Sequence, residues 1–226
     1  MSVIGNSNVS TKSTSSNNLK TFYKLKIILI GDSGVGKTSL LSRYMDEPFI
    51  PNKPCTINAD FKIKSIKIDQ LTSAQITIWD TCGQEKYRAM TKQYFKDAHG
   101  IILMFDVCDK RSFADLNIWL EEIKKNMPKD DVSIVLCGNK IDLKFRNISF
   151  EDANNFAKNN GLTYSETPSK EGINIEVAFE NVTKEIIEKM NKKNKINNDY
   201  TGKVSLNNNC EFRGKELKRE KEVKCC

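Results

Sequence analysis

Short apolar runs and stretches of helical periodicity alternate along the middle of the chain. Four apolar runs, each bounded by glycine or turn residues, predict buried strands: LKIILI (25–30), GIILMFDV (100–107), SIVLCG (133–138) and LTYSE (162–166). Residues 60–80, DFKIKSIKIDQLTSAQITIWD, lack a helical period and predict two strands joined by a hairpin.

Helical spacing fills the segments between these strands. Ser112 precedes apolar residues at helical intervals, and Asp115 three positions later completes a capping-box pattern that predicts a helix start. A second helical series comprises Ile175, Ala178, Val182 and Ile186. The alternation predicts an α/β fold with a mostly parallel, doubly wound sheet, one antiparallel hairpin strand and helices on both faces. Such sheets bind ligands at the carboxyl ends of their strands.

The two ends of the chain differ from this middle part. Residues 1–20 are rich in Ser, Asn and Thr, and residues 191–226 are rich in Asn and Lys with few large apolar side chains. Neither segment can bury enough apolar surface to offset the entropy of ordering it, so we expect both to be disordered. The folded domain is predicted to span residues 21–190.

The cysteine content and the distribution of apolar residues restrict the cellular compartment and the class of protein. The seven cysteines are an odd number without CxxC spacing, which indicates neither a disulfide framework nor a zinc site and is typical of a reducing, cytosolic compartment. No 18 apolar residues run together and the N-terminus lacks an apolar h-region. Neither a membrane span nor a signal peptide is therefore predicted.

The net charge of +7 is concentrated in the tail. Residues 1–190 carry 26 Lys and Arg against 24 Asp and Glu, whereas residues 191–226 carry 10 against 5. A basic tail beside terminal cysteines indicates an anionic membrane surface more than nucleic acid, and the alternative interpretation is a solvated, disordered tail.

The run at 25–30 leads into the loop GDSGVGKTS. A loop of this spacing turns successive backbone N–H groups toward phosphate oxygens, and the following helix N-terminus adds positive potential. The Lys37 ammonium would reach the β- and γ-phosphates, and the Thr38 hydroxyl would bind Mg²⁺. The predicted phosphate-binding residues are Gly31, Asp32, Ser33, Gly34, Val35, Gly36, Lys37, Thr38 and Ser39.

The phosphate loop alone does not distinguish ATPases, kinases and GTPases, but the motif GNKID at residues 138–142 does. The Asp142 carboxylate can accept hydrogen bonds from both N1–H and N2–H₂ of guanine, while Asn139 and Lys140 frame the base. Adenine does not offer this pair of donors. The order of the two motifs therefore predicts guanine selectivity and argues against a P-loop kinase or ATPase.

With these motifs in place, the chain resembles the Ras superfamily of small GTPases and, within it, the Rab branch. The resemblance covers residues 22–190 and rests on GDSGVGKTSL, WDTCGQEKYRAM, YFKDAHG, GNKID and ETPSK, in the family's order. TINADF and ETPSKEGINIEVAF most resemble the late-endosomal Rab subgroup. The resemblance implies the P-loop small GTPase fold and a monomeric GTPase. Its intrinsic turnover should be slow, on the order of 10⁻⁴ to 10⁻³ per second, because no arginine finger is evident in cis.

The same resemblance implies a Mg²⁺ site that accompanies bound GTP or GDP. Thr38 and Thr56 would supply hydroxyl ligands, with Thr56 as the switch I residue that completes the Mg²⁺ shell when the γ-phosphate is present. Asp80 would hold the ion through water.

The resemblance also implies the groups that act on the γ-phosphate and complete the base pocket. Gly83 would offer its N–H to the γ-phosphate, and Gln84 would orient the attacking water. Lys37 and Gln84 are thus the predicted catalytic residues. Ser169 and Lys170 would complete the guanine pocket.

Asn58, Cys82 and Pro168 depart from the family pattern, and the aromatic residue that commonly covers the nucleotide from switch I is replaced in the NKP segment (52–54). Asn58 replaces a glycine and is the non-glycine residue type that best tolerates a positive φ, whereas Cys82 replaces an alanine and should change the γ-phosphate neighbourhood. Pro168 replaces a serine and removes one local hydrogen bond, which would lower nucleotide affinity. A non-hydrolysing binding module, locked in one state by Asn58 and Cys82, is the alternative function, and retention of Gly83 and Gln84 argues against it.

Several aromatic residues and one histidine require a separate interpretation. His99 lacks a paired carboxylate or nucleophile in the sequence and is interpreted as structural. Trp79 and Trp119 are interpreted as packing residues. Phe61, Trp79 and Tyr94 lie in or beside the segments that move with nucleotide in the family, so we expect them to form a partner-facing aromatic surface.

The resemblance implies a switch in vesicular membrane traffic that recruits effectors in the GTP state. Its expected partners are an exchange factor, a GTPase-activating protein and a GDP dissociation inhibitor or escort protein. Geranylgeranylation of Cys225 and Cys226 would attach it to the cytoplasmic face of endomembranes, the late endosome or lysosome for the subgroup above, in exchange with the cytosol. We expect no nucleic-acid partner.

Overall fold

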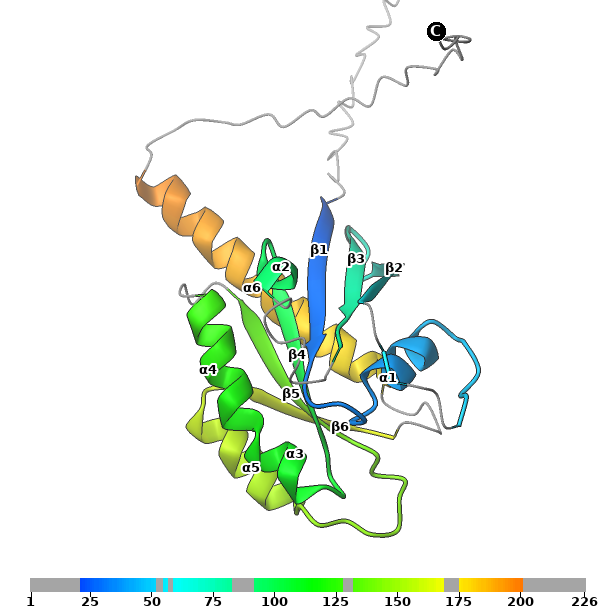
Figure 1. The fold of residues 1–226 in the computed structure, drawn as a ribbon. Helices are drawn as coiled ribbons and strands as arrows, with labels where there is room; N and C mark the ends of the chain where they lie inside the picture. The colour runs from blue at the N-terminus through cyan, green and yellow to red at the C-terminus, as the bar shows by residue number, and fades with distance from the viewer. Residues whose placement is uncertain are drawn as a thin grey trace, which may run out of the picture. The chain divides into compact units, whose positions relative to one another are not determined.

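The computed structural model of the chain describes residues 21–51, 55–56, 59–82, 92–127, 132–168 and 175–200, with only the backbone described at 92–93 and 193–200 (Figure 1). Six strands form one sheet in the order β2-β3-β1-β4-β5-β6. The elements are β1 (Thr21–Ile30), α1 (Lys37–Tyr44), β2 (Asp60–Lys67), β3 (Thr72–Asp80), α2 (Lys92–Phe95), β4 (Gly100–Asp106), α3 (Lys110–Ala114), α4 (Leu116–Asn126), β5 (Ser133–Asn139), α5 (Phe150–Asn159), β6 (Thr163–Thr167) and α6 (Ile175–Tyr200).

The sheet has the predicted mixture of strand directions. β2 and β3 pair in antiparallel register, and every other neighbouring pair is parallel. Because parallel strands need crossover connections, helices must cover the faces of the sheet, and the apolar strand centres are buried on both sides. The α/β fold class and the hairpin at residues 60–80 are therefore confirmed.

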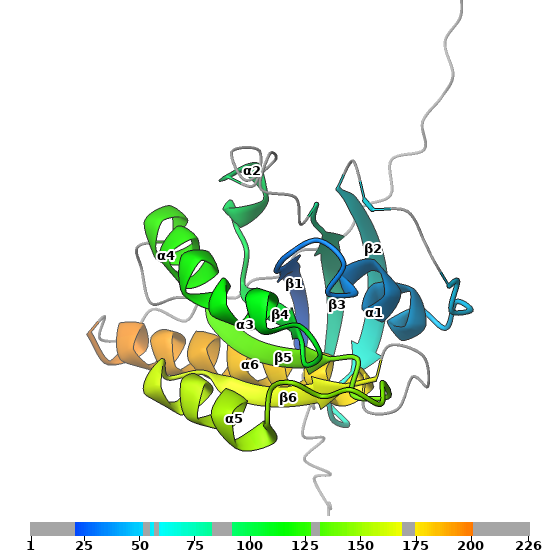
Figure 2. The same cartoon turned by 60° about the horizontal axis from the view of Figure 1, so that its bottom comes forward.

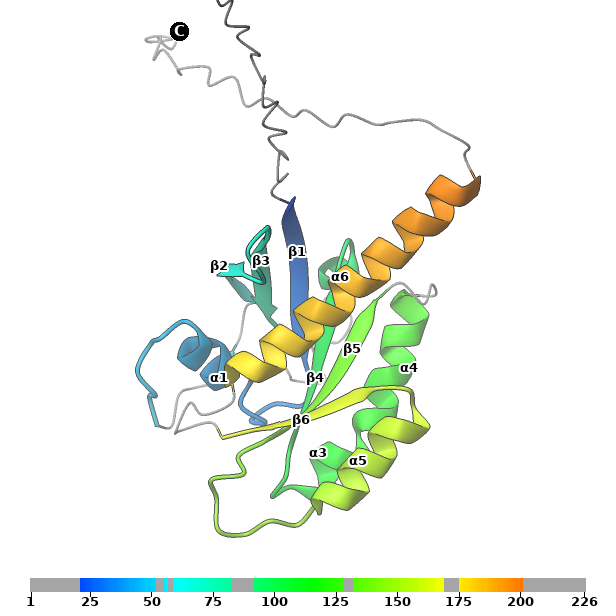
Figure 3. The same cartoon turned by 180° about the vertical axis from the view of Figure 1, so that it is seen from behind.

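Two apolar clusters lie on opposite faces of the sheet. α1 and α6 pack on one face, as the view from behind shows for α6 (Figure 3), while α2, α4 and α5 pack on the other. Even and odd positions of β1 divide between them: Ile27 and Leu29 face α1 and α6, and Ile28 and Ile30 face the other helices. All four strand residues are fully buried.

The strands agree with the predicted runs within one residue, except at the start of β1. β1 begins at Thr21, four residues before the apolar run, because its first residues pair with β3 from Thr72 onward. Backbone pairing thus extends the strand through Lys24, whose side chain is exposed. An apolar run marks the buried part of a strand and not its full length.

The predicted helix start at Ser112 is wrong. α3 begins at Lys110, and its N-cap is Asp109, whose carboxylate accepts a hydrogen bond from the Arg111 backbone N–H at 2.9 Å. Ser112 lies within α3, where its buried hydroxyl donates to the Asp109 carbonyl at 2.9 Å and accepts from the Asp106 N–H at 3.0 Å. Asp115 separates α3 from α4 and does not complete a capping box.

The last helix carries the second predicted helical series. Ile175, Ala178, Val182 and Ile186 are all buried on one side of α6, as the spacing predicts. α6 continues to Tyr200, ten residues past the expected end of the domain at residue 190. The contacts of the chain divide it after Met190. Among the described residues no helix is long and apolar enough to cross a membrane.

Candidate functional site

The carboxyl ends of the parallel strands lie at one edge of the sheet, toward the viewer in Figure 2. The loop from β1 to α1 crosses this edge. Strand register places Asp106, Asn139 and Thr167 side by side at the ends of β4, β5 and β6. Polar residues that are far apart in the sequence therefore converge where the fold predicts a ligand.

The loop of residues 31–36 has a backbone that requires glycine. Gly31 has φ of 144°, and a Cβ there would lie 2.2 Å from the Met104 carbonyl oxygen. Gly36, the N-cap of α1, has a left-handed conformation and makes no side-chain cap to the first turn. The first N–H groups of α1 are thus left for a ligand, which suits an anion at this helix N-terminus.

Lys37 lies folded over this loop. Its ammonium donates hydrogen bonds of 2.7 Å to the carbonyl oxygens of Gly31 and Asp32, and the residue is 5% exposed. Burial lowers the pKa of Lys37 to about 8, although the carboxylates of Asp80 and Asp32 oppose the shift. The loop thus holds a buried cation on neutral carbonyl groups.

Thr38, Thr56 and Asp80 meet beside Lys37, as the resemblance implied. The Thr38 hydroxyl lies 2.7 Å from the Thr56 hydroxyl and donates to the Asp80 carboxylate at 2.6 Å. These donors come from α1, from the segment before β2 and from the end of β3. All three are hard oxygen donors, the kind that Mg²⁺ prefers, so the residues fit the ion. Within the described ranges no three His, Cys, Asp or Glu side chains form an alternative metal cluster.

Hydrogen bonds to the phosphate loop and to β6 hold the first residue of the NKID part of the guanine motif, Asn139, in place. The Asn139 side chain is fully buried, donates to the Val35 carbonyl at 2.8 Å and accepts from the Thr167 hydroxyl at 3.2 Å. It therefore ties β5 to the phosphate loop and to β6, a role that the sequence motif did not reveal. Asp142 is half-buried in the turn that follows β5.

Asp106 is a site residue that the sequence reasoning missed. Its carboxylate pairs with the Lys140 ammonium at 2.6 Å and accepts from the Cys108 N–H at 2.9 Å. Lys140 itself has a positive φ of 66°. An acidic residue at the end of a buried parallel strand was the available signal, because ligands of such sheets bind at the carboxyl ends of the strands.

A network of ion pairs and hydrogen bonds holds the loop after the guanine motif. Arg146 forms a two-pronged ion pair with Glu166, and the Tyr164 hydroxyl donates to the same carboxylate at 2.6 Å. Burial disfavours the charge on Glu166, but the hydrogen bonds from Arg146 and Tyr164 outweigh burial and lower its pKa. The side chain of Arg146 also donates to the Ile148 carbonyl. This network links the loop to β6 beside the predicted base pocket.

The remaining predicted site residues fall into two groups. Cys82 is half-buried, and Pro168 is buried immediately after β6. Outside the described residues lie Asn58, Gly83, Gln84, Ser169, Lys170, Cys225 and Cys226.

His99 has contacts that agree with a structural role. Its imidazole Nδ1 accepts from the Lys26 backbone N–H at 3.1 Å, and the His99 backbone N–H donates to the Lys26 carbonyl at 2.8 Å. Burial lowers the pKa of His99. The neutral imidazole therefore serves as a hydrogen-bond partner of β1.

The three aromatic residues expected to face partners form a continuous row. The ring centroids of Phe61 and Trp79 are 5.1 Å apart, and those of Trp79 and Tyr94 are 5.5 Å apart. The Lys26 ammonium lies 5.2 Å from the Trp79 ring centroid. Because Phe61 is 48% exposed, the row presents apolar area at the surface of β2 and β3.

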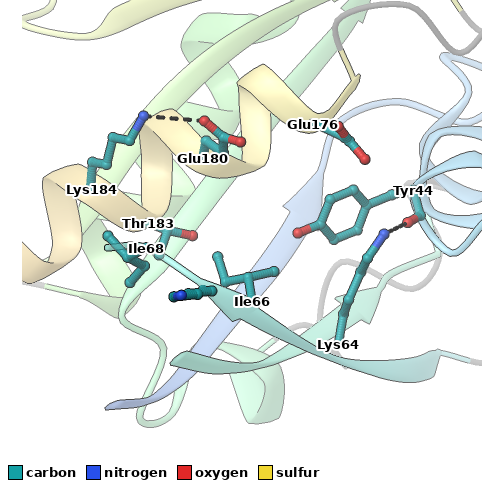
Figure 4. A pocket seen from close by; sticks show the side chains of 9 residues that line it. Tyr44, Lys64, Ile66, Ile68, Glu176, Glu180, Thr183 and Lys184 are labelled. Atoms are coloured by element: carbon teal, nitrogen blue, oxygen red, sulfur yellow. Dashed lines mark hydrogen bonds and ion pairs between the residues drawn. The ribbon is translucent and has the colours of Figure 1, made fainter. Parts of the chain in front are cut away.

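A separate hollow of about 280 Å³ lies on the opposite face, between β2 and α6 (Figure 4). Tyr44 stacks on Phe179 with ring centroids 3.9 Å apart, and the Lys64 ammonium lies 4.2 Å from the Tyr44 ring centroid. Burial, followed by the nearby Glu176 and Glu180, raises the pKa of Tyr44 to about 12. No residue of the phosphate loop or the guanine motif lines this hollow, so it is distinct from the strand-end site.

Comparison with known proteins identifies the class. The model of the Ras family matches residues 26–188. Relatives include Ras-related protein Rab-26 of Bos taurus (41% identical over 175 residues, 76% of this chain and 68% of the relative) and Ras-related protein RABD2a of Arabidopsis thaliana (43% over 169 residues, 74% and 82%). GTP-binding protein YPT1 of Saccharomyces cerevisiae is 38% identical over 196 residues, 86% of this chain and 93% of the relative.

The chain therefore belongs to the Ras family of small GTPases. Within the family it is of the Rab type, a small GTPase that hydrolyses GTP to GDP and phosphate. Ras-family GTPases use Mg²⁺ with the bound nucleotide. The relatives do not single out the late-endosomal subgroup.

Proposed function

We propose that this chain is a guanine-nucleotide switch of vesicular membrane traffic, which recruits effector proteins while GTP is bound and releases them after hydrolysis. The observation that supports this most is the hydrogen bond from Asn139 to the Val35 carbonyl, because it joins the guanine motif to the phosphate loop. Two motifs 104 residues apart thereby contribute to one site. An exchange factor, a GTPase-activating protein and a GDP dissociation inhibitor or escort protein would control the cycle.

The nucleotide would bind across the carboxyl ends of β1, β4 and β5. Backbone N–H groups of residues 31–39 would bind the phosphates, and the Lys37 ammonium would exchange its carbonyl partners for phosphate oxygens. Asp142 would accept from the guanine donors, beside Lys140 held by Asp106. Ser169 and Lys170 would close the base pocket.

Thr38, Thr56 and Asp80 would hold Mg²⁺, which when bound neutralises charge on the phosphates. The Thr56 hydroxyl belongs to the segment between α1 and β2, so its hydrogen bond to Thr38 marks where that segment responds to the nucleotide. Loss of the γ-phosphate would release this segment and alter the partner surface next to β2.

Hydrolysis would depend on positioning and electrostatics. Gln84 would orient the attacking water, and the Gly83 N–H together with Lys37 would stabilise charge on the γ-phosphate. The chain supplies no arginine finger in the motifs above, so the intrinsic rate should be slow, on the order of 10⁻⁴ to 10⁻³ per second, and an activating partner would raise it.

Single-turnover hydrolysis with Gln84→Leu tests this function. The amide acts on water in the transition state, so the rate should fall about a hundredfold while GTP affinity stays nearly unchanged. Gln70→Leu, the same change at an exposed hairpin residue, is the matched control and should leave the rate unaltered. Equal rates for Gln84→Leu and the unaltered protein would favour the non-hydrolysing binding module.

Membrane attachment would use geranylgeranyl groups on Cys225 and Cys226. One lipid gives marginal attachment, whereas two hold a protein stably because each buried CH₂ contributes about 0.8 kcal/mol. Residues 213–224 carry six basic and three acidic side chains, so their attraction to an anionic surface contributes at most about 3 kcal/mol. The proposed location is the cytoplasmic face of endomembranes, in exchange with the cytosol.

Fractionation of cysteine variants tests the attachment. Replacing both Cys225 and Cys226 by Ser should move the protein to the cytosolic fraction without changing nucleotide binding, and replacing one should weaken attachment. Cys210→Ser, in the same tail, is the control that should stay on membranes. Membrane retention of the double variant at physiological salt would contradict the lipid anchor.

A further inference from the structure

The Tyr164 side chain packs against the first residue of the guanine motif. A Cβ at Gly138 would lie 2.5 Å from the Tyr164 hydroxyl oxygen and 3.1 Å from the Phe105 ring, so the glycine leaves room for this hydroxyl. In the register of β5 and β6, Gly138 lies beside Glu166, whose carboxylate accepts a hydrogen bond of 2.6 Å from the same hydroxyl. The Glu166 carboxylate is thereby connected to the start of the motif.

The same carboxylate is connected to the loop that follows the motif. Arg146, four residues after Asp142 in the sequence, binds both oxygens of Glu166 with its two terminal nitrogens, one of them at 3.1 Å. The Glu166 side chain is 16% exposed, so this two-pronged ion pair is partly shielded from water and restricts the geometry of both partners. Tyr164, Glu166 and Arg146, together called the Glu166 network, therefore link the first residue of the motif to the loop beyond its last residue.

The segment between Asp142 and Arg146 has little apolar packing of its own. Residues 143–145 are all exposed, and the side chain of Phe145 is 83% exposed. Arg146 connects this segment to β6, the strand that leads in sequence to the expected base-pocket residues 169–170. The ion pair therefore sets the spacing between the two segments that would flank the base.

We propose that the Glu166 network positions the base-recognition loop, so that the Asp142 carboxylate accepts hydrogen bonds from both N1–H and N2–H₂ of guanine. This inference rests on the proposed nucleotide site and deepens it. Two hydrogen bonds to one carboxylate require a close alignment of base and loop, because each weakens steeply when its distance or angle departs from the optimum. Loss of the ion pair should therefore weaken the contact with the guanine amino group and affect a base without that group less.

Equilibrium binding of GDP and of inosine diphosphate (IDP), whose base lacks the N2 amino group, tests this inference. The unaltered chain should prefer GDP by about tenfold or more, the effect of one hydrogen bond to a charged group. In Arg146→Gln this preference should fall below about threefold through weaker GDP binding, while IDP affinity changes less than about twofold. Arg111→Gln, the same change at an exposed residue 4.0 Å from the Asp115 carboxylate, is the matched control and should leave both affinities unchanged.

Two further variants test whether Arg146 acts through Glu166. In a Glu166→Ala background, Arg146→Gln should change the preference for GDP less than about twofold further, because no carboxylate remains for the guanidinium to bind. Tyr164→Phe removes the hydroxyl donor but keeps the ring, whose centroid lies 5.3 Å from that of Phe150. Because Glu166 then loses one of its donors, the preference for GDP should fall about threefold.

The ratio of the two affinities separates base recognition from general stability, because a loss of folded protein lowers both affinities alike. Equal weakening of GDP and IDP binding by Arg146→Gln would overturn the inference, as would an undiminished effect of this substitution in the Glu166→Ala background. An unchanged preference in Tyr164→Phe would also overturn it. Failure of the unaltered chain to bind GDP, or to prefer it to IDP, would contradict the proposed guanine site itself. A preference for GDP that Arg146→Gln leaves intact would contradict the inference alone.

Discussion

The guanine side and the phosphate side of the site both bury polar side chains, but they give them different partners. Asn139 is fully buried between a backbone carbonyl and the Thr167 hydroxyl, and Lys140 pairs with the Asp106 carboxylate. Lys37 is nearly as buried, yet its ammonium is held by the carbonyl oxygens of the loop itself.

Because of these different partners, the two sides should respond differently to a ligand. On the guanine side the Asn139 and Lys140 side chains have protein partners, so the base enters a preorganised pocket. Its binding then depends on hydrogen bonds to the Asp142 carboxylate. On the phosphate side a cation sits on neutral dipoles that stabilise it less well than an anion does. The Lys37 ammonium therefore gains from exchanging its partners for phosphate, and its protonation should be linked to binding.

The largest expected effect concerns base recognition. Asp142→Asn replaces a carboxylate that accepts two guanine donors by an amide, which should weaken GTP binding by about 2–3 kcal/mol and favour xanthosine nucleotides. Titration with guanosine and with xanthosine nucleotides measures both affinities. Asp97→Asn, an isosteric change at an exposed position with φ of 58°, is the control and should leave affinity unchanged. Unaltered GTP affinity in Asp142→Asn would contradict the guanine assignment.

The two sides should also differ in what they contribute to the stability of the nucleotide-free protein. Asn139→Ala leaves the Val35 carbonyl without this donor and leaves the Thr167 hydroxyl only its 3.2 Å contact with the Cys137 sulfur, so the free energy of unfolding should fall by about 2 kcal/mol. Lys37→Met removes a buried cation and keeps the length of the side chain, so stability should be unchanged or higher. Urea unfolding measures both variants, and a larger loss for Lys37→Met would reverse the comparison.

The sequence predicted the residues of the site better than their partners. The phosphate loop and GNKID have fixed local spacing, because backbone curvature and base recognition each need particular residues at particular intervals. The hydrogen bonds from Asn139 to Val35 and from Trp119 to Asp32 join positions 104 and 87 residues apart. No local pattern encodes such pairs, since strand order and helix packing bring them together.

The errors in the fold have equally physical reasons. Ser112 fits a capping box, but Asp109 precedes it in an extended conformation and its carboxylate reaches the first free N–H groups. Spacing alone does not distinguish Ser112 from a competing N-cap three residues earlier. The four additional residues of β1 are strand because β3 pairs with them, and three of the four are exposed, so they do not belong to the buried apolar run.

The smallest expected effect is a pH dependence confined to the phosphate side. Because the pKa of Lys37 is lowered to about 8 in the free protein, part of the population loses the ammonium charge as pH rises past that value. Bound phosphate favours the charged form and raises the pKa, so binding takes up protons and GDP affinity should fall about threefold between pH 7.5 and 8.5, ~0.7 kcal/mol. The unfolded chain, with an ordinary lysine pKa, binds more protons than the folded chain between pH 8 and 10.5. Stability of the nucleotide-free protein should therefore rise with pH in that window.

Titration calorimetry in two buffers of different ionisation enthalpy measures the proton uptake at pH 8.5. Lys37→Arg is the matched variant, because a guanidinium stays charged throughout this range and its affinity profile should be flat. Asp142→Asn, on the guanine side, should bind more weakly at every pH but keep the slope of the unaltered protein. If the GDP affinity of Lys37→Arg fell with pH as steeply as that of the unaltered protein, the titrating group would not be Lys37. The inferred difference between the preorganised guanine side and a phosphate side where Lys37 exchanges its partners would then be wrong.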